Sequence, residues 1–284
     1  MTGDALAPAP APVVVVALMD ARHDLGVLLQ ELGRYAESVK TLKRGTELAR
    51  QQFGSGHFLY GKMANALAVT LKYRGDYAEA AAWYRVARPI FEAERGTRSD
   101  AMASLLHNLG GLAHATGRSA EGIIHARESC RIRESLHGPD HPDLAADLAN
   151  LGGLLFATGD LAEARRTFTA ALRIYRDCDP PRPTEVAVNL NNLAAVADES
   201  GHSRQAEDLY QEALVLKRTL WGDNHPDTQL TRYNLAVLWA ADGRRAEARE
   251  VLRDVVAVLK GTVTEEHLLL RRARERLMLL ESSS

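Results

Sequence analysis

Residues 138–168, GPDHPDLAADLANLGGLLFATGDLAEARRTF, contain most of a unit that the chain repeats every 42 residues. The marker of the unit is Gly159, which has a counterpart at identical spacing in each of six copies. A fixed period of this length is typical of a solenoid, whose repeats stack on their neighbours because none can bury its apolar side alone. The sequence therefore predicts six copies of one structural unit. Their register glycines are Gly33, Gly75, Gly117, Gly159, Gly201 and Gly243.

The residues before each register glycine predict a first helix, helix A. A leucine lies eight positions before the glycine in every copy, a small residue follows it, and three positions after the leucine comes another apolar residue, except at Thr70. This spacing places the apolar residues on one helix face, and glycine tolerates the left-handed geometry of a helix end. We expect this stripe to lie in the core. Its members are Leu25, Leu67, Leu109, Leu151, Leu193 and Leu235, with Leu28, Leu112, Leu154, Val196 and Leu238 three positions later.

The residues after each register glycine predict a second helix, helix B. Four positions on, five copies have glutamate and one has Gln205, and acidic residues complement the positive end of a helix. The next residue is small in every copy, so the two helices can approach closely where they cross. In the linkers GPDHPD (138–143) and GDNHPD (222–227), proline suits the first position of the next helix A. We interpret His141 and His225 as structural parts of these linkers.

This arrangement resembles the tetratricopeptide repeat, from about residue 13 to residue 282. The period, the string NNLA at 191–194 and the two HPD linkers resemble its kinesin-light-chain-like subfamily, although Asp24 and Ala66 depart from the later asparagines. The resemblance implies an all-α, right-handed superhelical solenoid of six helix-turn-helix repeats with a C-terminal capping helix. We expect a disordered Ala/Pro-rich tail at 1–12, the six repeats at 13–263 and the capping helix at 264–284.

Composition and motifs exclude several function classes. The net charge is −2 with both signs mixed throughout, which disfavours a nucleic-acid partner, and no apolar run is long enough to span a membrane. Cys130 and Cys178 lie in different repeats, which fits a reducing cytoplasm. No catalytic or nucleotide-binding motif occurs, so neither an enzyme nor a cofactor is expected. His107 and His114 are seven residues apart, about 10 Å along a helix, so we expect no metal site.

The resemblance also points to candidate binding residues. It implies that helix A lines a concave groove and that an asparagine nine positions before the register glycine holds the main chain of a peptide. A carboxamide suits this role because it both donates and accepts a hydrogen bond. The alternative is that these asparagines only fix the register between repeats. The candidate peptide-binding residues are Asn65, Asn108, Asn150, Asn191, Asn192, Asn234, His107, Tyr233, Gly111 and Gly153.

The leading functional interpretation is a non-enzymatic protein–protein interaction module that binds a peptide segment or a partner protein in this groove, as a monomer or weak homo-oligomer. One alternative is a structural or assembly scaffold acting through helix B or the ends of the array. The apolar start at 13–16, with no preceding repeat to cover it, motivates that alternative. Another is an enzyme with an active site recruited in the groove, in which His107, His114 and Asp198 would be the acid–base groups.

Overall fold

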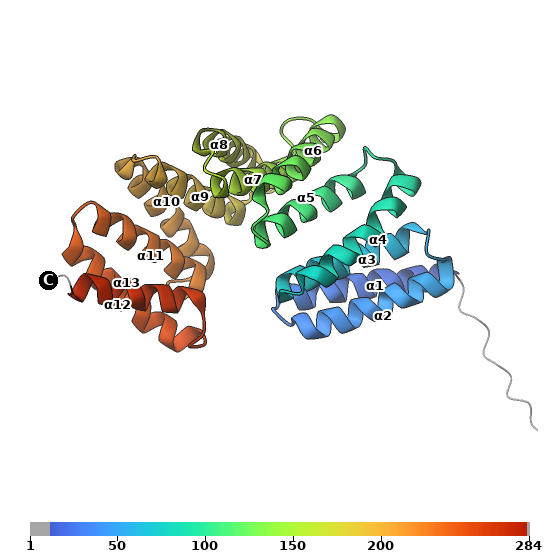
Figure 1. The fold of residues 1–284 in the computed structure, drawn as a ribbon, viewed down its shortest axis with the longest axis horizontal. Helices are drawn as coiled ribbons and strands as arrows, with labels where there is room; N and C mark the ends of the chain where they lie inside the picture. Colours follow the sequence, from blue (N-terminus) through green and yellow to red (C-terminus); the bar gives the residue numbers. More distant parts are fainter. Residues whose placement is uncertain (1–11, 283–284) are drawn as a thin grey trace, which may run out of the picture. The chain divides into compact units, whose positions relative to one another are not determined.

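The computed structural model describes residues 12–282, and every regular element within them is an α-helix (Figure 1). Residues 1–11 of the predicted tail lie outside the described residues. No helix of the described chain combines the length and apolar character needed to cross a membrane. The helices are α1 (Pro12–Glu31), α2 (Tyr35–Phe53), α3 (Phe58–Arg74), α4 (Tyr77–Arg95), α5 (Asp100–Ala115), α6 (Ser119–His137), α7 (Pro142–Ala157), α8 (Leu161–Asp177), α9 (Pro183–Glu199), α10 (Ser203–Trp221), α11 (Pro226–Ala241), α12 (Arg245–Thr262) and α13 (Leu268–Ser282).

These elements form six successive A–B pairs followed by α13, which confirms the predicted all-α repeat fold. The chain divides into two compact units, Met1–Leu136 (unit 1) and His137–Ser284 (unit 2). In unit 1, α3 contacts both α1 and α5, and in unit 2 α9 contacts α7 and α11 while α11 also contacts α13. Neighbouring helices A therefore touch one another within each unit. The superhelical hand stays a prediction.

The register glycines end helix A as predicted. Gly75 has φ +94° and ψ 3°, and its N–H donates to the carbonyl oxygens of Leu71 and Lys72 at the end of α3. All six register glycines have φ between 71° and 94°. A side chain at this φ would collide with the backbone, so glycine is the residue that fits.

Close crossing of the two helices explains the small residues. Leu42 of α2 fills the space above Gly26, where a Cβ atom would lie 2.5 Å from the Leu42 side chain. Phe168 of α8 fills the same place in the fourth repeat, and a Cβ on Gly152 would lie 2.8 Å from its ring. Both large side chains are buried. The small residue five positions after the glycine is buried in every repeat, as its predicted role requires.

The first repeat departs from the predicted core stripe. Leu25 and Leu28 are 48% and 51% exposed, whereas the matching Leu151 and Leu154 of α7 are buried. The prediction that the stripe is buried in every copy is therefore wrong for α1. The physical reason is that α1 packs on α2 and α3 with an adjacent side, which includes Met19 and Leu29, and no described helix covers the stripe.

The linker histidines cap the helices that follow them. His141 Nδ1 accepts a hydrogen bond from the N–H of Asp143 at 3.2 Å, and His225 Nδ1 does the same for Asp227 at 3.2 Å. The prolines that begin α7 and α11 lie between these pairs. The interpretation of both histidines as structural is confirmed. Cys130 and Cys178 form no disulfide.

Candidate protein-interaction surfaces

The candidate peptide-binding residues all lie on helices A, and each is partly exposed. They do not share one environment. Some contact the neighbouring repeat, and others border open space. The members in unit 1 are Asn65, His107, Asn108 and Gly111, and those in unit 2 are Asn150, Gly153, Asn191, Asn192, Tyr233 and Asn234.

In unit 1 two of the asparagines bind each other. Asn108 Nδ2 of α5 donates to Asn65 Oδ1 of α3 at 3.3 Å, across the boundary between the second and third repeats. This contact fixes the register of the two helices. Each carboxamide keeps further hydrogen-bonding capacity, because an amide has two donor hydrogens and an acceptor oxygen with two lone pairs. The register role and a ligand role are therefore compatible at this pair.

The space beside Gly111 is filled by a lysine. A Cβ atom on Gly111 would lie 3.1 Å from Lys72 Nζ, which reaches over from α3 and also lies 4.8 Å from the centre of the Tyr73 ring. Burial lowers the pKa of the Lys72 ammonium, and no carboxylate of the described chain pairs with it. The space that a glycine could leave open to a ligand at Gly111 is thus taken by a partly desolvated cation.

In unit 2, Asn191 also contacts its neighbouring repeat. Thr231 Oγ1 of α11 donates to Asn191 Oδ1 at 3.0 Å and accepts from Lys217 Nζ at 3.0 Å. Lys217 also donates to the carbonyl oxygen of Asp227 at 3.3 Å. Burial lowers the pKa of Lys217, and the nearby Asp227 charge opposes that shift. Asn191 therefore belongs to a buried polar network that joins α9, α10 and α11.

The next residue, Asn192, has different surroundings. It forms no side-chain hydrogen bond within the described chain and remains partly exposed on α9. On α7, nothing lies within 4 Å of the position that a Cβ would take on Gly153, so the space beside this glycine is open. In unit 2, the helices A therefore present a polar side chain at Asn192 and open space beside Gly153.

Tyr233 and Asn234 line a hollow of about 300 Å³ between α11 and α13. A second hollow of about 220 Å³ borders it and shares Tyr233 and Arg272. Together we call them the α11–α13 hollow. Two buried nitrogens at its walls, His267 Nδ1 and Arg276 Nε, have no hydrogen-bond partner within the described chain. The remaining lining residues are Pro226, Asp227, Leu230, Leu268, Leu269, Glu275 and Leu279.

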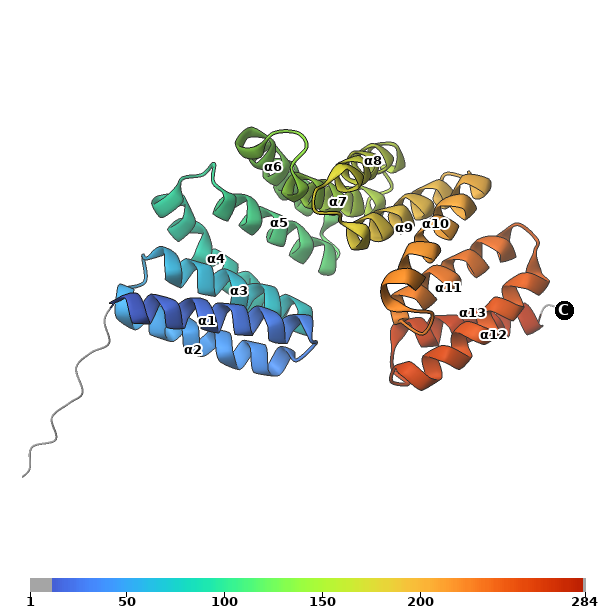
Figure 2. The same ribbon diagram turned by 180° about the vertical axis from the view of Figure 1, so that it is seen from behind.

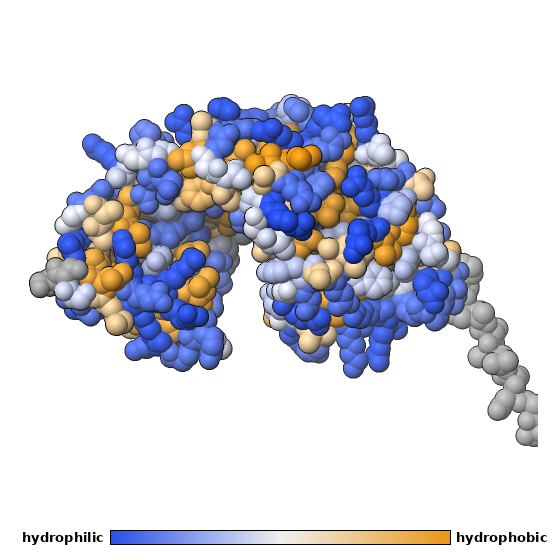
Figure 3. Space-filling view, viewed as in Figure 1, coloured by the Kyte–Doolittle hydropathy of each residue, from blue (hydrophilic) through white to orange (hydrophobic). Residues whose placement is uncertain are grey.

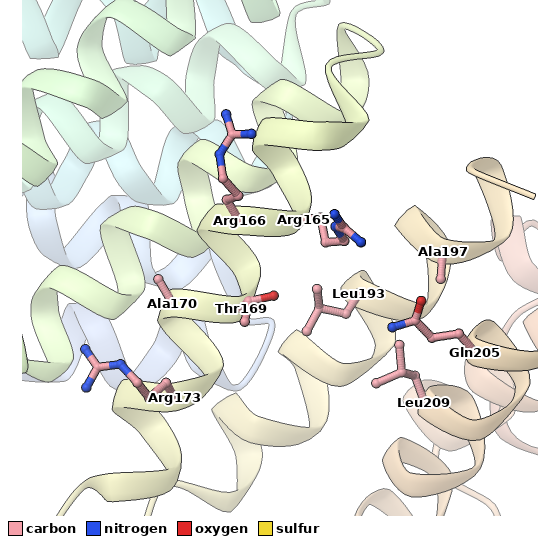
Figure 4. Close-up of a pocket in the computed structure, with 9 residues that line it drawn as sticks. All are labelled: Arg165, Arg166, Thr169, Ala170, Arg173, Leu193, Ala197, Gln205 and Leu209. Atoms are coloured by element: carbon pink, nitrogen blue, oxygen red, sulfur yellow. The ribbon is translucent and has the colours of Figure 1, made fainter. Parts of the chain in front are cut away.

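A larger hollow of about 570 Å³ lies between α8, α9 and α10, and we call it the α8–α10 hollow (Figure 4). Leu193 and Ala197 of α9 form its buried floor, and Leu209 of α10 borders them. The close-up shows Arg165 extending toward α9 and α10, while Arg166 and Arg173 point away from that side. Arg173 pairs with Asp140 at 2.7 Å. Sequence reasoning missed this hollow because it attended to helix A. The adjacent basic residues Arg165 and Arg166 of helix B, which line this hollow, were the feature of the sequence that could have indicated it.

The acid–base groups of the enzyme alternative do not meet within one unit. His107 and His114 lie on α5 in unit 1, and Asp198 lies on α9 in unit 2. Burial and the charges of Glu199 and Asp242 raise the pKa of Asp198. Among residues 12–282 there is no group of three or more His, Cys, Asp or Glu side chains able to hold a metal ion.

Comparison of the sequence with protein families identifies the repeat. A tetratricopeptide repeat model matches residues 18–93 and 101–177, which is more than half of the chain. Two further tetratricopeptide repeat models match residues 186–227 and 229–254. The chain belongs to the tetratricopeptide repeat family. Tetratricopeptide repeats are protein-interaction scaffolds, so this chain is one such module. The comparison with curated proteins finds no match.

Several solved tetratricopeptide repeat structures share the fold. BtubC (BKLC) from P. vanneervenii aligns with a TM-score of 0.64 and 22% identity over 76% of this chain and 85% of that one. PilF of Pseudomonas aeruginosa aligns with a TM-score of 0.59 and 18% identity over 92% and 99%. A variant of a candidate kinesin light chain of Podosopora anserina, with nearly identical repeats, aligns with a TM-score of 0.50 and 18% identity over 86% and 95%. The likeness to kinesin-light-chain repeats is therefore confirmed as a likeness of fold.

Proposed function

We propose that this tetratricopeptide repeat protein is a non-enzymatic module that binds a peptide segment of a partner protein along its helices A. The α11–α13 hollow is the main contact. The observation that supports this most directly is the pair of buried, unpartnered nitrogens, His267 Nδ1 and Arg276 Nε, at the walls of a hollow that also holds Asn234. Buried polar atoms are normally hydrogen-bonded, so a ligand that supplies acceptors or a donor here is favoured.

The chemistry of the hollow suits a peptide with an apolar anchor. Leu230, Leu268 and Leu269 offer an apolar wall to one ligand side chain, and burial of such a side chain is the main source of affinity. Asn234 can pair with a peptide N–H and C=O, which are present in every sequence. Arg272, which has no ion-pair partner in the described chain, can bind a ligand carboxylate or carbonyl oxygen.

Within unit 2, Asn192 of α9 and the open space at Gly153 of α7 extend the proposed surface beyond this hollow. A peptide that follows the helices A would meet a carboxamide in successive repeats. The proposal assigns Asn191 to the register, through its bond from Thr231, and assigns the ligand contact to Asn192, whose carboxamide has no hydrogen bond within the described chain. The proposal thus separates two adjacent asparagines, of which Asn192 binds the ligand and Asn191 fixes the register.

This separation gives a matched experiment. Proteins that the wild type captures from its source cell are quantified with Asn192→Leu/Asn234→Leu and, as the control, with Asn191→Leu. We expect the double variant to lose a defined partner while its thermal midpoint stays near the wild-type value. Asn191→Leu should keep that partner and melt at a lower temperature, because it removes the 3.0 Å acceptor of the buried Thr231 hydroxyl and leaves only the longer contact to the Asp227 carbonyl oxygen at 3.4 Å. Undiminished capture by the double variant would refute the role of these asparagines.

A photo-crosslinking amino acid tests the location directly. Placed at Tyr233 in the hollow, it should crosslink the partner, whereas the same group at Val215, which is 63% exposed on helix B α10, should not. Crosslinking only from Val215 would move the binding surface to helix B and contradict the proposal.

A further inference from the structure

The exposed side of α1 is an apolar stripe. Val14, Leu18, Leu25, Leu28 and Leu32 are between 43% and 62% exposed, and with Ala21 they alternate at spacings of four and three residues. This is the 3.5-residue period at which one helix packs along another. Figure 2 shows α1 beside α2 and α3 within unit 1. We call this stripe the α1 face.

The last helix also has an uncovered side with apolar residues. Leu268, Met278 and Leu279 of α13 are between 58% and 68% exposed. Arg271, Arg272 and Glu275 lie on the same side of the helix, between the apolar ends. The space-filling view shows hydrophobic patches among hydrophilic residues over this part of unit 2 (Figure 3). We call this side the α13 face.

The charges beside the two faces have opposite sign. Asp24 and Glu31 are exposed along one edge of the α1 face. Asp24 pairs with the neighbouring His23 at 3.1 Å, and its side chain remains 79% exposed. On the α13 face, Arg271 and Arg272 have no ion-pair partner in the described chain, while Arg274 pairs with Glu265. Glu275 reduces the positive charge of that face without cancelling it.

We propose that the α1 face of one copy of this chain docks on the α13 face of a second copy, head to tail. The contact buries the two apolar surfaces against each other and places Asp24 and Glu31 next to Arg271 and Arg272. Charge complementarity selects this pairing over α1 against α1, because a two-fold pairing would bring acidic edges together. The α13 face shares Arg272, Leu268 and Leu279 with the α11–α13 hollow, so this docking and the proposed peptide contact would compete for that face. The α1 face carries none of the proposed peptide-binding residues, so variants of α1 test the docking separately from the peptide function.

The contact is heterologous, because it joins two different surfaces. Such contacts close into a ring if the rotation between copies permits, and otherwise they extend into an open chain. Both faces are small and partly charged, so the association is weak and falls with salt. We therefore expect the weight-average mass in sedimentation to rise between micromolar and submillimolar concentration at low ionic strength, and to fall back when salt is added.

Charge reversal provides the decisive experiment. Asp24→Arg/Glu31→Arg alone and Arg271→Glu/Arg272→Glu alone should each weaken association by at least about tenfold, because each chain then carries like charges on both faces. An equimolar mixture of the two variants should associate as the wild type does, because its mixed contacts are complementary again. Glu94→Arg/Glu134→Arg, two exposed acids of α4 and α6, is the control with the same change in net charge and should leave association unchanged.

A separate variant tests how much the apolar side chains of the α1 face contribute to association. Leu25→Ser/Leu28→Ser changes side chains that are already half exposed, so the helical melt should be kept while association is lost. A wild type that stays monomeric throughout the concentration range would overturn the proposal. So would a mixture that fails to recover, or an Arg271→Glu/Arg272→Glu variant that associates normally, which would indicate α1–α1 pairing. Association gained by deleting residues 1–11 would assign the α1 face to that segment and overturn the proposal as well.

Discussion

Gly152 and Gly153 are adjacent in α7, yet alanine should stabilise the protein at Gly153 and not at Gly152. A Cβ on Gly152 would lie 2.8 Å, 2.8 Å and 2.9 Å from three ring atoms of Phe168, which is buried. A Cβ on Gly153 would have nothing within 4 Å. Alanine in a helix interior is favoured over glycine by about 1 kcal/mol, and this gain applies equally to both positions.

The difference therefore lies in the packing. Normal carbon contacts are about 3.5–4.0 Å, so Gly152→Ala must displace the Phe168 ring or separate α7 from α8. Overpacking of a well-filled core costs about 1–3 kcal/mol. The free energy of unfolding should fall by about 0–2 kcal/mol for Gly152→Ala and rise by about 1 kcal/mol for Gly153→Ala. At about 2–4 °C per kcal/mol for a unit of this size, the two thermal midpoints should be clearly resolved.

Circular dichroism at the helical minimum, followed in heat and in urea, measures both variants. Phe168→Leu in the Gly152→Ala background should recover part of the loss, because it removes ring atoms that the new Cβ meets. The reasoning is refuted if Gly152→Ala is as stable as Gly153→Ala, or if Phe168→Leu costs the same in both backgrounds. Either result would mean that the helices do not cross as closely at Gly152 as the structure has them.

Two further effects follow from the buried and capping groups of unit 2. His141→Ala and His225→Ala should each lower the free energy of unfolding by about 1 kcal/mol in urea titrations, because each removes a cap acceptor. His202→Ala, at an N-cap whose side chain makes no such bond, is the matched control and should be neutral. For Lys217, the folded pKa is lowered below that of the unfolded chain, so the unfolded state binds more protons in the window below the ordinary value of 10.5. Wild-type stability should therefore rise relative to Lys217→Met as pH increases toward 10.5, and a flat or falling difference between the two urea midpoints would contradict the buried ammonium.

The sequence was sufficient for the repeat because its constraints are local. The positive φ at the end of each helix A requires a glycine, and the close crossing of the two helices requires a small residue opposite Leu42 or Phe168. Each constraint recurs in copy after copy, so the period could be read without knowing any contact. The prediction that Leu25 and Leu28 are buried was wrong because it also relied on this local pattern alone. Their pattern matches the inner repeats, but burial depends on a neighbouring helix that the pattern itself does not supply.

The candidate site was less predictable because duplication copies a residue type without copying its partners. Gly111 and Gly153 occupy equivalent positions, yet Lys72 of the preceding repeat fills the space at one and nothing fills the space at the other. The α8–α10 hollow was missed for a related reason. It is formed by side chains from three helices, and only their packing shows that Arg165 faces the Leu193 floor.

The asparagines show how one repeated residue can serve two purposes. At the third repeat, Asn108 uses its amide to hold Asn65, so the position contributes to register there. In the fifth repeat, the hydrogen bond to the neighbouring repeat is made by the preceding residue, Asn191, which accepts from Thr231. Asn192 therefore has no side-chain hydrogen bond within the described chain. A side chain that makes no structural hydrogen bond can bind a ligand without destabilising the fold. This is why the adjacent pair Asn191 and Asn192, rather than the ladder as a whole, is the place where register and recognition can be separated by measurement.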